Sequence, residues 1–351
     1  MTAIDLFALQ PYMTAADYRS EAAFLAKLDR LFARAAALRR APVAVAVLPE
    51  DVASFLALAL PAAGGLAGDP DVRTLDAAFA RLGRRMAGRL AATALAARAL
   101  SLRRAFFLAA APTVWTIWSR SVRTLARRYA MTVVGGSALL PDDAGGYRGD
   151  TLLPRGNRIY NLSLTVGPDG RTRAVTRKVN LVPTQEDRLG LSPGRAEAVP
   201  VLDLDPALPG IGLATAICYD AFRVPHTDRE PRFHPLLPDL GRRGASLVAQ
   251  PSANPWPWAG PWVLGRPGDS RTRSRQWDEE GALAALRDAP EVAVVVNALL
   301  LLDLWDVHFD GRSAIFGRDA AGQPVILAAA AGYHAGPDAE TVVHYRWEPE
   351  Q

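Results

Sequence analysis

The composition of this 351-residue chain excludes several classes of protein before any motif is considered. Half of the residues are hydrophobic, which allows a large core and argues against disorder. The net charge of +4 reflects 40 basic and 36 acidic residues, an excess too small to indicate a nucleic-acid partner. The single cysteine excludes an intramolecular disulfide framework and any multi-cysteine metal site.

The sequence indicates neither a secretion signal nor a membrane-spanning segment. Residues 1–5 lack the basic start and apolar core of a secretion signal. No apolar run reaches the roughly 18 to 20 residues that span a bilayer. The nearest candidate, residues 52–68, is interrupted by Pro61, Gly64 and Gly65. We therefore expect a cytoplasmic protein.

Strand and helix patterns alternate in the first part of the chain. Residues 4–9 are expected to form a strand, and residues 22–38 a helix with apolar side chains at helical spacing. Residues 43–48 are continuously apolar and partly β-branched, which is typical of a strand buried on both faces. A second helix is expected over residues 114–129.

The segment at residues 52–111 is rich in Ala, Leu and Arg, and we expect it to be helical. Arg81, Arg84, Arg85 and Arg89 recur at helical spacing and would form a basic stripe. Such a stripe can contact an anionic membrane or an acidic partner, but more often it is a solvated face. We expect a solvated face without membrane contact.

Strands dominate the rest of the chain. Residues 159–166 and 172–178 flank a Gly-Pro-Asp-Gly turn, and because Gly tolerates positive φ we expect a β-hairpin over 159–178. Further strands are expected at 131–137, 199–204, 211–217, 246–250, 292–298, 313–316, 324–329 and 341–346. No internal repeat or low-complexity linker divides the chain, so we expect one α/β domain over residues 1–351.

The only cysteine, Cys218, follows the apolar run at 211–217, and Pro225 indicates that the strand has ended by then. A thiol at the end of a buried strand is held rigidly, which suits a nucleophile. A buried cysteine can equally fill space in a core.

Two charged residues occupy comparable positions. Glu50 follows the run at 43–48, and Lys178 closes the second strand of the expected hairpin. Each has a simpler interpretation, since glutamate is favoured at a helix N-terminus and lysine at a solvated strand edge. Together with Cys218, however, they supply a base for the thiol proton and a cation for an oxyanion, as attack on a carbonyl or nitrile carbon requires.

Several fragments, in their order and spacing, resemble the nitrilase, or carbon–nitrogen hydrolase, superfamily. They cover most of the chain and include Leu48-Pro-Glu50, Arg177-Lys178, Leu181-Val-Pro183 and Ala216-Ile-Cys218-Tyr-Asp220. The resemblance implies a four-layer α-β-β-α sandwich and a triad of Glu50 as general base, Lys178 as oxyanion-side cation and Cys218 as nucleophile.

The resemblance also implies supporting groups. The backbone N–H of Tyr219 would complete the oxyanion hole, and Glu186 would be an assisting glutamate, with Asp187 as the alternative. No cofactor is expected. His226 and His308 lie near the motifs but lack the spacing of metal ligands, so we expect no metal site.

The sequence departs from the family pattern in two places. The helical segment at about 52–111 is longer than is common in the family, and residues 254–262 form a cluster rich in Pro and Trp. Trp256 and Trp258 in this cluster would form an apolar wall of the substrate pocket, or they would pack rigidly at the surface.

We interpret the chain as a cysteine-dependent hydrolase of non-peptide C–N bonds, an amidase that forms a thioester acyl-enzyme. Cys-Tyr-Asp resembles the amide-hydrolysing branches more than the true nitrilases, which tend to carry Trp-Glu after the cysteine. The alternatives are a nitrilase or an N-acyltransferase of the same superfamily, or a catalytically inactive relative that acts by binding. The expected partners are a small-molecule amide or nitrile and further copies of the chain, in a homodimer or larger homo-oligomer.

Overall fold

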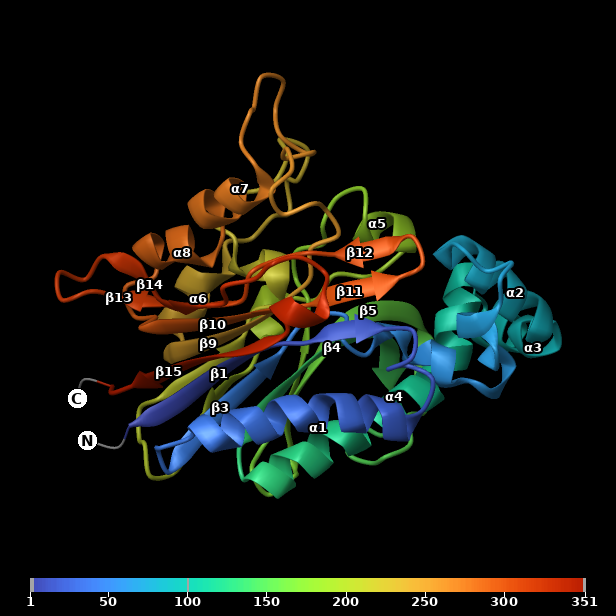
Figure 1. Cartoon of the computed structure of the whole chain (residues 1–351), viewed down its shortest axis with the longest axis horizontal. Helices are drawn as coiled ribbons and strands as arrows, with labels where there is room; N and C mark the ends of the chain where they lie inside the picture. Colours follow the sequence, from blue (N-terminus) through green and yellow to red (C-terminus); the bar gives the residue numbers. More distant parts are fainter. Residues whose placement is uncertain (1–2, 100, 350–351) are drawn as a thin grey trace.

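Two six-stranded β-sheets face each other in the computed structural model, which describes residues 3–99 and 101–349 (Figure 1). Residues 1–2, 100 and 350–351, which belong to the expected domain and its 52–111 segment, lie outside the described residues. The first sheet has the order β15-β1-β3-β4-β5-β6. Its strands are β1 (Ile4–Gln10), β3 (Val43–Leu48), β4 (Thr132–Asp143), β5 (Pro154–Val166), β6 (Thr172–Arg177) and β15 (Thr341–Trp347).

The second sheet repeats this plan with the order β14-β13-β10-β9-β8-β7. Its strands are β7 (Val201–Asp203), β8 (Gly212–Thr215), β9 (Ala245–Ser252), β10 (Val294–Leu299), β13 (Ala314–Arg318) and β14 (Pro324–Ala329). In each sheet three parallel strands, β1, β3 and β4 or β8, β9 and β10, are flanked by antiparallel ones. A small third sheet joins β2 (Tyr12–Thr14), β11 (Leu301–Leu304) and β12 (Val307–Phe309).

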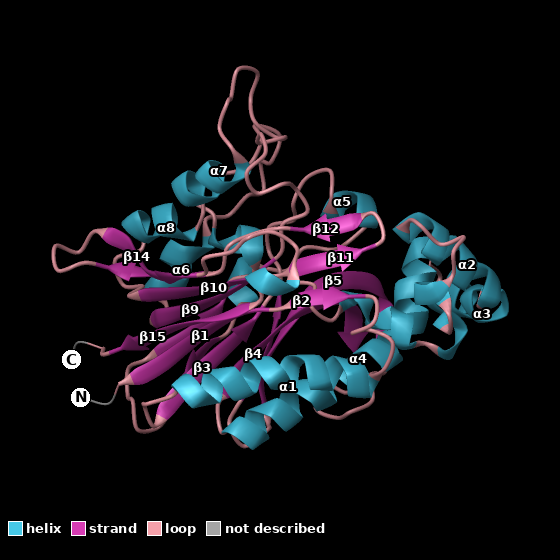
Figure 2. Ribbon diagram, viewed as in Figure 1, coloured by secondary structure: helices cyan, strands magenta, loops and turns pink. Residues whose placement is uncertain are grey.

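Helices cover the outer faces of both large sheets, so the layers run helix, sheet, sheet, helix (Figure 2). The helices are α1 (Glu21–Leu38), α2 (Leu75–Arg85), α3 (Ala87–Ala97), α4 (Leu102–Tyr129), α5 (Glu186–Leu189), α6 (Leu236–Arg242), α7 (Arg273–Glu280) and α8 (Ala282–Ala285). α1 and α4 pack on the first sheet, and α6 and α8 on the second. The expected α/β class is confirmed, and the layering agrees with the expected four-layer sandwich.

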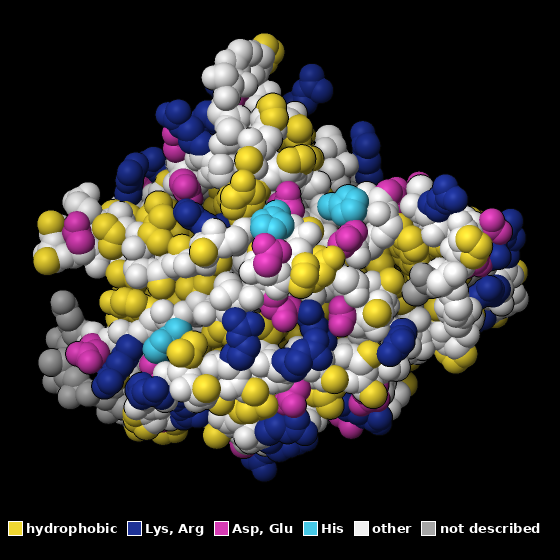
Figure 3. Space-filling model, in the orientation of Figure 1, with side chains coloured by type: hydrophobic (Ala, Val, Ile, Leu, Met, Phe, Trp, Pro, Cys, Tyr) yellow, Lys and Arg dark blue, Asp and Glu magenta, His cyan; other side chains and the backbone are white. Residues whose placement is uncertain are grey.

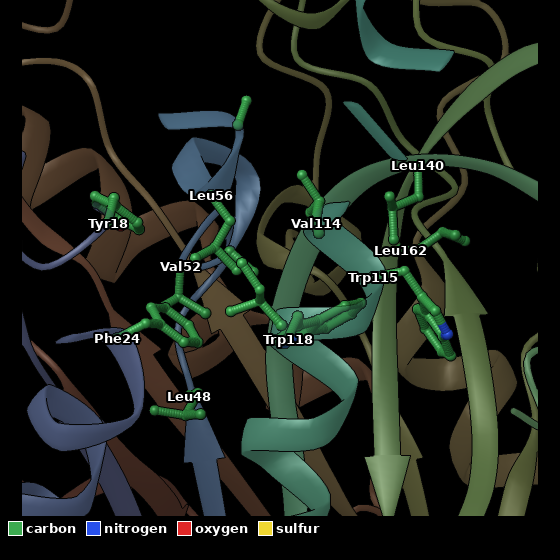
Figure 4. Packing of buried hydrophobic residues seen from close by; sticks show 14 of the residues in the cluster. Tyr18, Phe24, Leu48, Val52, Leu56, Val114, Trp115, Trp118, Leu140 and Leu162 are labelled. Atoms are coloured by element: carbon green, nitrogen blue, oxygen red, sulfur yellow. The ribbon is translucent and has the colours of Figure 1, made fainter. Parts of the chain in front are cut away.

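Three apolar layers hold this arrangement together. Between the sheets, Leu6 and Val45 of the first sheet meet Leu247 and Val296 of the second, and all four side chains are buried. The layer under α1 and α4 is larger. Figure 4 shows part of it, with side chains from α1, the segment after β3, α4 and β4: Phe24, Val52, Leu56, Trp118 and Leu140. Burial of one such side chain contributes about 1.5–3 kcal/mol, so these layers fix how the two sheets meet.

The 52–111 segment forms three short 3-10 turns, followed by α2, α3 and the start of α4, at one end of the molecule (Figure 1). Three arginines of the predicted stripe contact acceptors of the same chain. Arg81 pairs with Asp69 at 2.7 Å, Arg85 donates to the Gly64 carbonyl at 2.8 Å, and Arg89 donates to the Ala109 carbonyl at 2.7 Å. These arginines therefore connect different parts of the 52–111 segment to one another.

The expected absence of membrane contact by this segment stays a prediction. Across residues 3–99 and 101–349, no helix combines the length and apolar character needed to cross a bilayer. Figure 3 shows Lys and Arg interspersed with Asp and Glu over the visible face.

Gly136 sits at a β-bulge of β4 where the chain passes the loop that carries Glu50. Its φ is +74°, and a Cβ there would lie 2.2 Å from the Pro49 carbonyl oxygen and 2.6 Å from Val52. A side chain at this position would therefore push against the Pro49–Glu50 backbone.

We expect Gly136→Ala to destabilise the fold by about 1–2 kcal/mol for the left-handed backbone, plus about 1–3 kcal/mol for the overpacked contact. Urea unfolding measures the sum. Gly146→Ala is the matched control, because Gly146 has φ +67° but nothing within 4 Å of its Cβ position. Equal losses in the two variants would contradict the proposed close approach.

Candidate active site

Two charged side chains and the thiol lie together at strand ends from both sheets. Glu50 lies two residues beyond β3, Lys178 follows β6 directly, and Cys218 lies three residues beyond β8. β6 runs in the same direction as β3, because β4 and β6 are both antiparallel to β5 and β3 is parallel to β4. The carboxyl ends of parallel strands meet at one edge of a sheet, where α/β proteins commonly bind ligands.

Lys178 is the centre of a buried polar network. Its Nζ donates to Glu50 Oε1 at 2.8 Å and to Glu186 Oε2 at 2.5 Å. The Asn161 amide nitrogen donates to the same two carboxylates, at 2.8 and 3.1 Å. Backbone N–H groups reach the remaining oxygens, from Ala253 to Glu50 at 3.0 Å and from Val182 to Glu186 at 2.9 Å. Two carboxylates and one ammonium are thus held by short contacts away from water.

The two candidates for the assisting carboxylate, Glu186 and Asp187, differ in position. Glu186, at the start of α5, is buried and contacts Lys178. Asp187 is exposed, and its carboxylate accepts a hydrogen bond from the Arg188 N–H. The structure therefore brings Glu186 to the candidate site and leaves Asp187 outside it.

Burial and neighbouring charge determine the protonation of this network. Burial raises the pKa of Glu50, and Lys178 opposes this shift while Glu186 adds to it. Burial lowers the pKa of Lys178, but the charges of Glu186 and Glu50 outweigh burial and hold the pKa well above its ordinary value. Lys178 therefore stays a cation, whereas Glu50 moves toward the pKa range that suits a general base.

Cys218 occupies a strained elbow between β8 and the rest of the site. Its φ is +50°, a region that costs a non-glycine residue on the order of 1–3 kcal/mol. The thiol is 3% exposed, and Sγ lies 3.6 Å from the Ala253 carbonyl oxygen. Burial, and then the negative charge of Glu50, raise the pKa of the thiol. The thiol is therefore protonated at neutral pH and needs a base before it can attack.

Two side chains hold the elbow in place. Gln250 Nε2 donates to the Cys218 carbonyl at 2.9 Å. The buried Asp220 carboxylate accepts from the N–H groups of Val179 at 3.0 Å and Asn180 at 2.6 Å, and from that of Ile217 at 3.2 Å. Asp220 thus ties the end of β6 to the elbow. Sequence reasoning assigned no role to Asn161, Asp220 or Gln250, although polar residues within or beside apolar strands were a signal for them.

Aromatic side chains close the site. Trp258 is buried in the cluster that contains Cys218, Tyr219 and Trp277, and Trp256 packs against this cluster. Glu50, Lys178 and Cys218 are each at most 3% exposed. Two surface grooves, of about 590 and 570 Å³, do not include these side chains. The roles of Trp256 and Trp258 as a pocket wall, and of the Tyr219 N–H as an oxyanion donor, remain predictions.

The two histidines near the motifs contact an aromatic and an acidic side chain. His226 is buried and stacks on Tyr219, with ring centres 3.9 Å apart, whereas His308 pairs with Asp303 at 3.1 Å. Within the part of the chain that the structure describes, no group of three His, Cys, Asp or Glu side chains could hold a metal ion.

Solved structures of similar fold belong to the nitrilase superfamily. Nit3 of Saccharomyces cerevisiae, a member of branch 10 of that superfamily, matches with a TM-score of 0.55 and 19% identity over 99% of this chain and 91% of its own. The amidase from Nesterenkonia sp. AN1, in a mutant with the acetamide moiety of fluoroacetamide added at the active site cysteine, matches with a TM-score of 0.52 and 17% identity over 99% and 90%.

The same mutant of that amidase, with acrylamide added to the active site cysteine, gives a TM-score of 0.51 and 17% identity over 99% of this chain and 94% of its own. No family model matches the sequence, and no curated protein matches it significantly. The expected resemblance is therefore confirmed in three dimensions: the chain has the fold of the nitrilase superfamily.

Proposed function

We propose that this chain is a cysteine-dependent carbon–nitrogen hydrolase, and specifically an amidase that works through a thioester. The observation that carries the proposal is the buried Glu50–Lys178 pair at the first sheet, whose Glu50 carboxylate adds to burial in raising the pKa of the Cys218 thiol at the second sheet. The amidase of similar fold supports it, because that protein is modified at its active site cysteine by an amide and by a haloamide. The amide class comes from this likeness and from Cys218-Tyr-Asp220.

In the proposed reaction, Glu50 takes the proton of the Cys218 thiol as Sγ attacks the amide carbonyl carbon. The carbonyl π electrons move to oxygen and form an oxyanion. The Lys178 ammonium and the Tyr219 N–H stabilise this charge, and in a buried site such stabilisation is stronger than in water.

Glu50, now a neutral acid, gives its proton to the amide nitrogen as the C–N bond breaks. Ammonia or an amine leaves, and the acyl group remains on Sγ as a thioester. Glu50 then takes a proton from water, whose oxygen attacks the thioester carbon and releases a carboxylic acid. Cys218 regains its proton, so the enzyme returns to its starting state.

Glu186 and Asn161 serve this cycle as positioning residues. Each contacts a group that reacts or stabilises charge: Glu186 holds the Lys178 ammonium, and Asn161 bridges Glu186 and Glu50. When Glu50 becomes neutral, the Glu186 carboxylate remains as the partner of Lys178, so the ammonium is not left unpaired in a buried site.

We expect Cys218→Ala to abolish amide turnover and leave the fold intact, because the thiol supplies the covalent step but little of the core. A screen of amides, nitriles and carbamoyl compounds measures turnover, and mass spectrometry detects an acyl adduct on Cys218 in the parent protein. Circular dichroism of the variant checks the fold. Undiminished turnover by the alanine variant would rule out the proposed nucleophile.

Glu50→Gln and Lys178→Met separate the roles of base and cation. Glu50→Gln should slow alkylation of Cys218 by iodoacetamide on the order of 10²-fold at neutral pH, because no oxyanion forms and only the base is lost. Lys178→Met should reduce amide turnover on the order of 10²–10³-fold but alkylation much less.

Asp187→Asn is the matched control, since that carboxylate is exposed and lies outside the network; it should change neither rate. If Glu50→Gln labels as fast as the parent protein across neutral pH, another group is the base.

The pH dependence of alkylation follows from the two raised pKa values. In the parent protein the labelling rate should fall as the pH drops through the Glu50 pKa, which burial holds above its ordinary value of 4.5, because a protonated carboxyl is not a base. In Glu50→Gln this acidic limb should vanish. Burial, the larger cause of the raised thiol pKa, remains, so labelling should rise only at alkaline pH. Rates measured between pH 4 and 10 on a logarithmic scale test this, and an unchanged acidic limb in the variant would contradict it.

A further inference from the structure

Arg273, the first residue of α7, carries a buried positive charge inside a cage of aromatic rings. It is 2% exposed, and its guanidinium carbon lies 4.3 Å from the centre of the Trp262 ring, 4.7 Å from that of Trp277 and 5.1 Å from that of Trp256. The loop before α7, orange in Figure 1, projects away from the sheets. Trp256 and Trp262 belong to the segment before α7, whereas Trp277 lies within α7 itself.

The polar contacts of Arg273 are with neutral amides. Nε donates to Asn254 Oδ1 at 2.9 Å, and Nη1 donates to Gln276 Oε1. Within residues 3–99 and 101–349 it forms no salt bridge, and Nη2 has no hydrogen-bond acceptor. Burying a cation costs several kcal/mol, whereas a cation–π contact returns about 0.5–2 kcal/mol. The cage offsets this cost without neutralising the charge. Burial lowers the pKa of Arg273 to about 9, so the group is still a cation at neutral pH.

Further hydrogen-bond donors without partners lie in the same cage. Trp277 Nε1 and His226 Nε2 are buried, and no acceptor among the described residues reaches them. Gln276 Nε2 lies 3.4 Å from His226 Nδ1, which makes Nδ1 the acceptor and places the imidazole proton on Nε2. His226 is neutral, because burial and the Arg273 charge hold its pKa well below the ordinary value. The cage thus presents donors and one cation. The Glu280 carboxylate lies next to it, where it accepts from Gln276 Nε2 at 2.5 Å and pairs with Arg271 at 2.7 Å, but among the described residues it forms no salt bridge with Arg273.

The cage adjoins the thiol. Trp277 belongs to the same apolar cluster as Cys218, and its ring centre lies 5.4 Å from that of Trp258, another member. A group bound at Arg273 would therefore be part of a molecule that reaches Cys218.

We propose that Arg273 binds a carboxylate of the substrate, so that the preferred substrates are amides of molecules that also carry a carboxylate. A carboxylate accepts two parallel N–H bonds from a guanidinium and supplies a direct counter-ion, which none of the described residues gives Arg273. A phosphate dianion suits the cage less, because the other cation of the site, Lys178, already contacts two carboxylates. This proposal depends on the amidase function proposed above.

The test compares amides that differ only in charge. Succinamate and glutaramate carry a carboxylate, and butanamide and pentanamide are uncharged amides of matching length. The parent protein should favour the charged pair in kcat/KM by at least about 30-fold. Arg273→Met should reduce kcat/KM for the charged pair by about 30- to 1000-fold and that for the uncharged pair by less than about threefold. Arg273→Lys should fall between the parent protein and Arg273→Met.

Arg275→Met is the matched control on the same helix. The Arg275 side chain is 70% exposed and pairs with Glu279 at 2.7 Å, so its loss should leave the selectivity of the parent protein unchanged. An equal loss for charged and uncharged amides in a folded Arg273→Met would show that Arg273 is only structural. Equal use of both amides by the parent protein would also overturn the proposal.

If Arg273→Met does not fold, a binding measurement on the parent protein still tests the proposal. Glutarate should protect Cys218 from iodoacetamide, whereas pentanamide at the same concentration should protect much less; equal protection refutes the carboxylate site. If no amide of any kind is turned over, the amidase function fails, and the protection assay still decides whether the carboxylate site exists. Turnover of uncharged amides without preference refutes only the present inference.

Discussion

One buried ammonium between two carboxylates determines the rest of the site. Lys178 meets Glu50 at 2.8 Å and Glu186 at 2.5 Å, and these residues come from the ends of β3 and β6 and from α5. Removing one partner of a buried pair typically costs about 3–5 kcal/mol, because the other charge stays unpaired away from water. The same contacts therefore hold three segments together and keep the carboxylate that we propose as the base beside a fixed positive charge.

Neither sheet contains the site by itself. The first sheet supplies Glu50 and Lys178, and the second supplies Cys218, so the chemistry depends on how the two sheets face each other. That relation is set by the apolar layer between them, and Asp220 adds a direct polar tie by accepting N–H groups from both sides. Because the layer is close-packed, small shifts between the sheets are costly, and the thiol-to-carboxylate geometry is preorganised.

The parts of this structure that the sequence predicted are those governed by local pattern. The strand at 43–48 and the 159–178 hairpin were recognisable from a continuous apolar run and from a Gly-containing turn, and both were confirmed. α4 begins at Leu102, although the sequence predicted a helix only from residue 114. Pro112, a residue type that usually marks a helix boundary, lies inside α4. β2, β11 and β12 have three or four residues, too few for a periodic signal, and they were missed.

The positions of Glu50, Lys178 and Cys218 at strand ends were readable from sequence, but the residues that orient them were not. Asn161 lies within β5, and its two bonds depend on carboxylates distant in sequence. Arg273 had no sequence signal, because its burial depends on Trp256 and Trp262, which precede α7 and reach Arg273 only in the folded chain. If the Arg273 charge meets a substrate carboxylate, selectivity comes from two sources. One is the attraction between the two charges, and the other is the free-energy cost of binding an amide that leaves Arg273 unpaired. An uncharged amide in the same place would leave a buried cation without a counter-ion, and a site built around a polar partner rejects analogues that lack it far more strongly than an apolar pocket does.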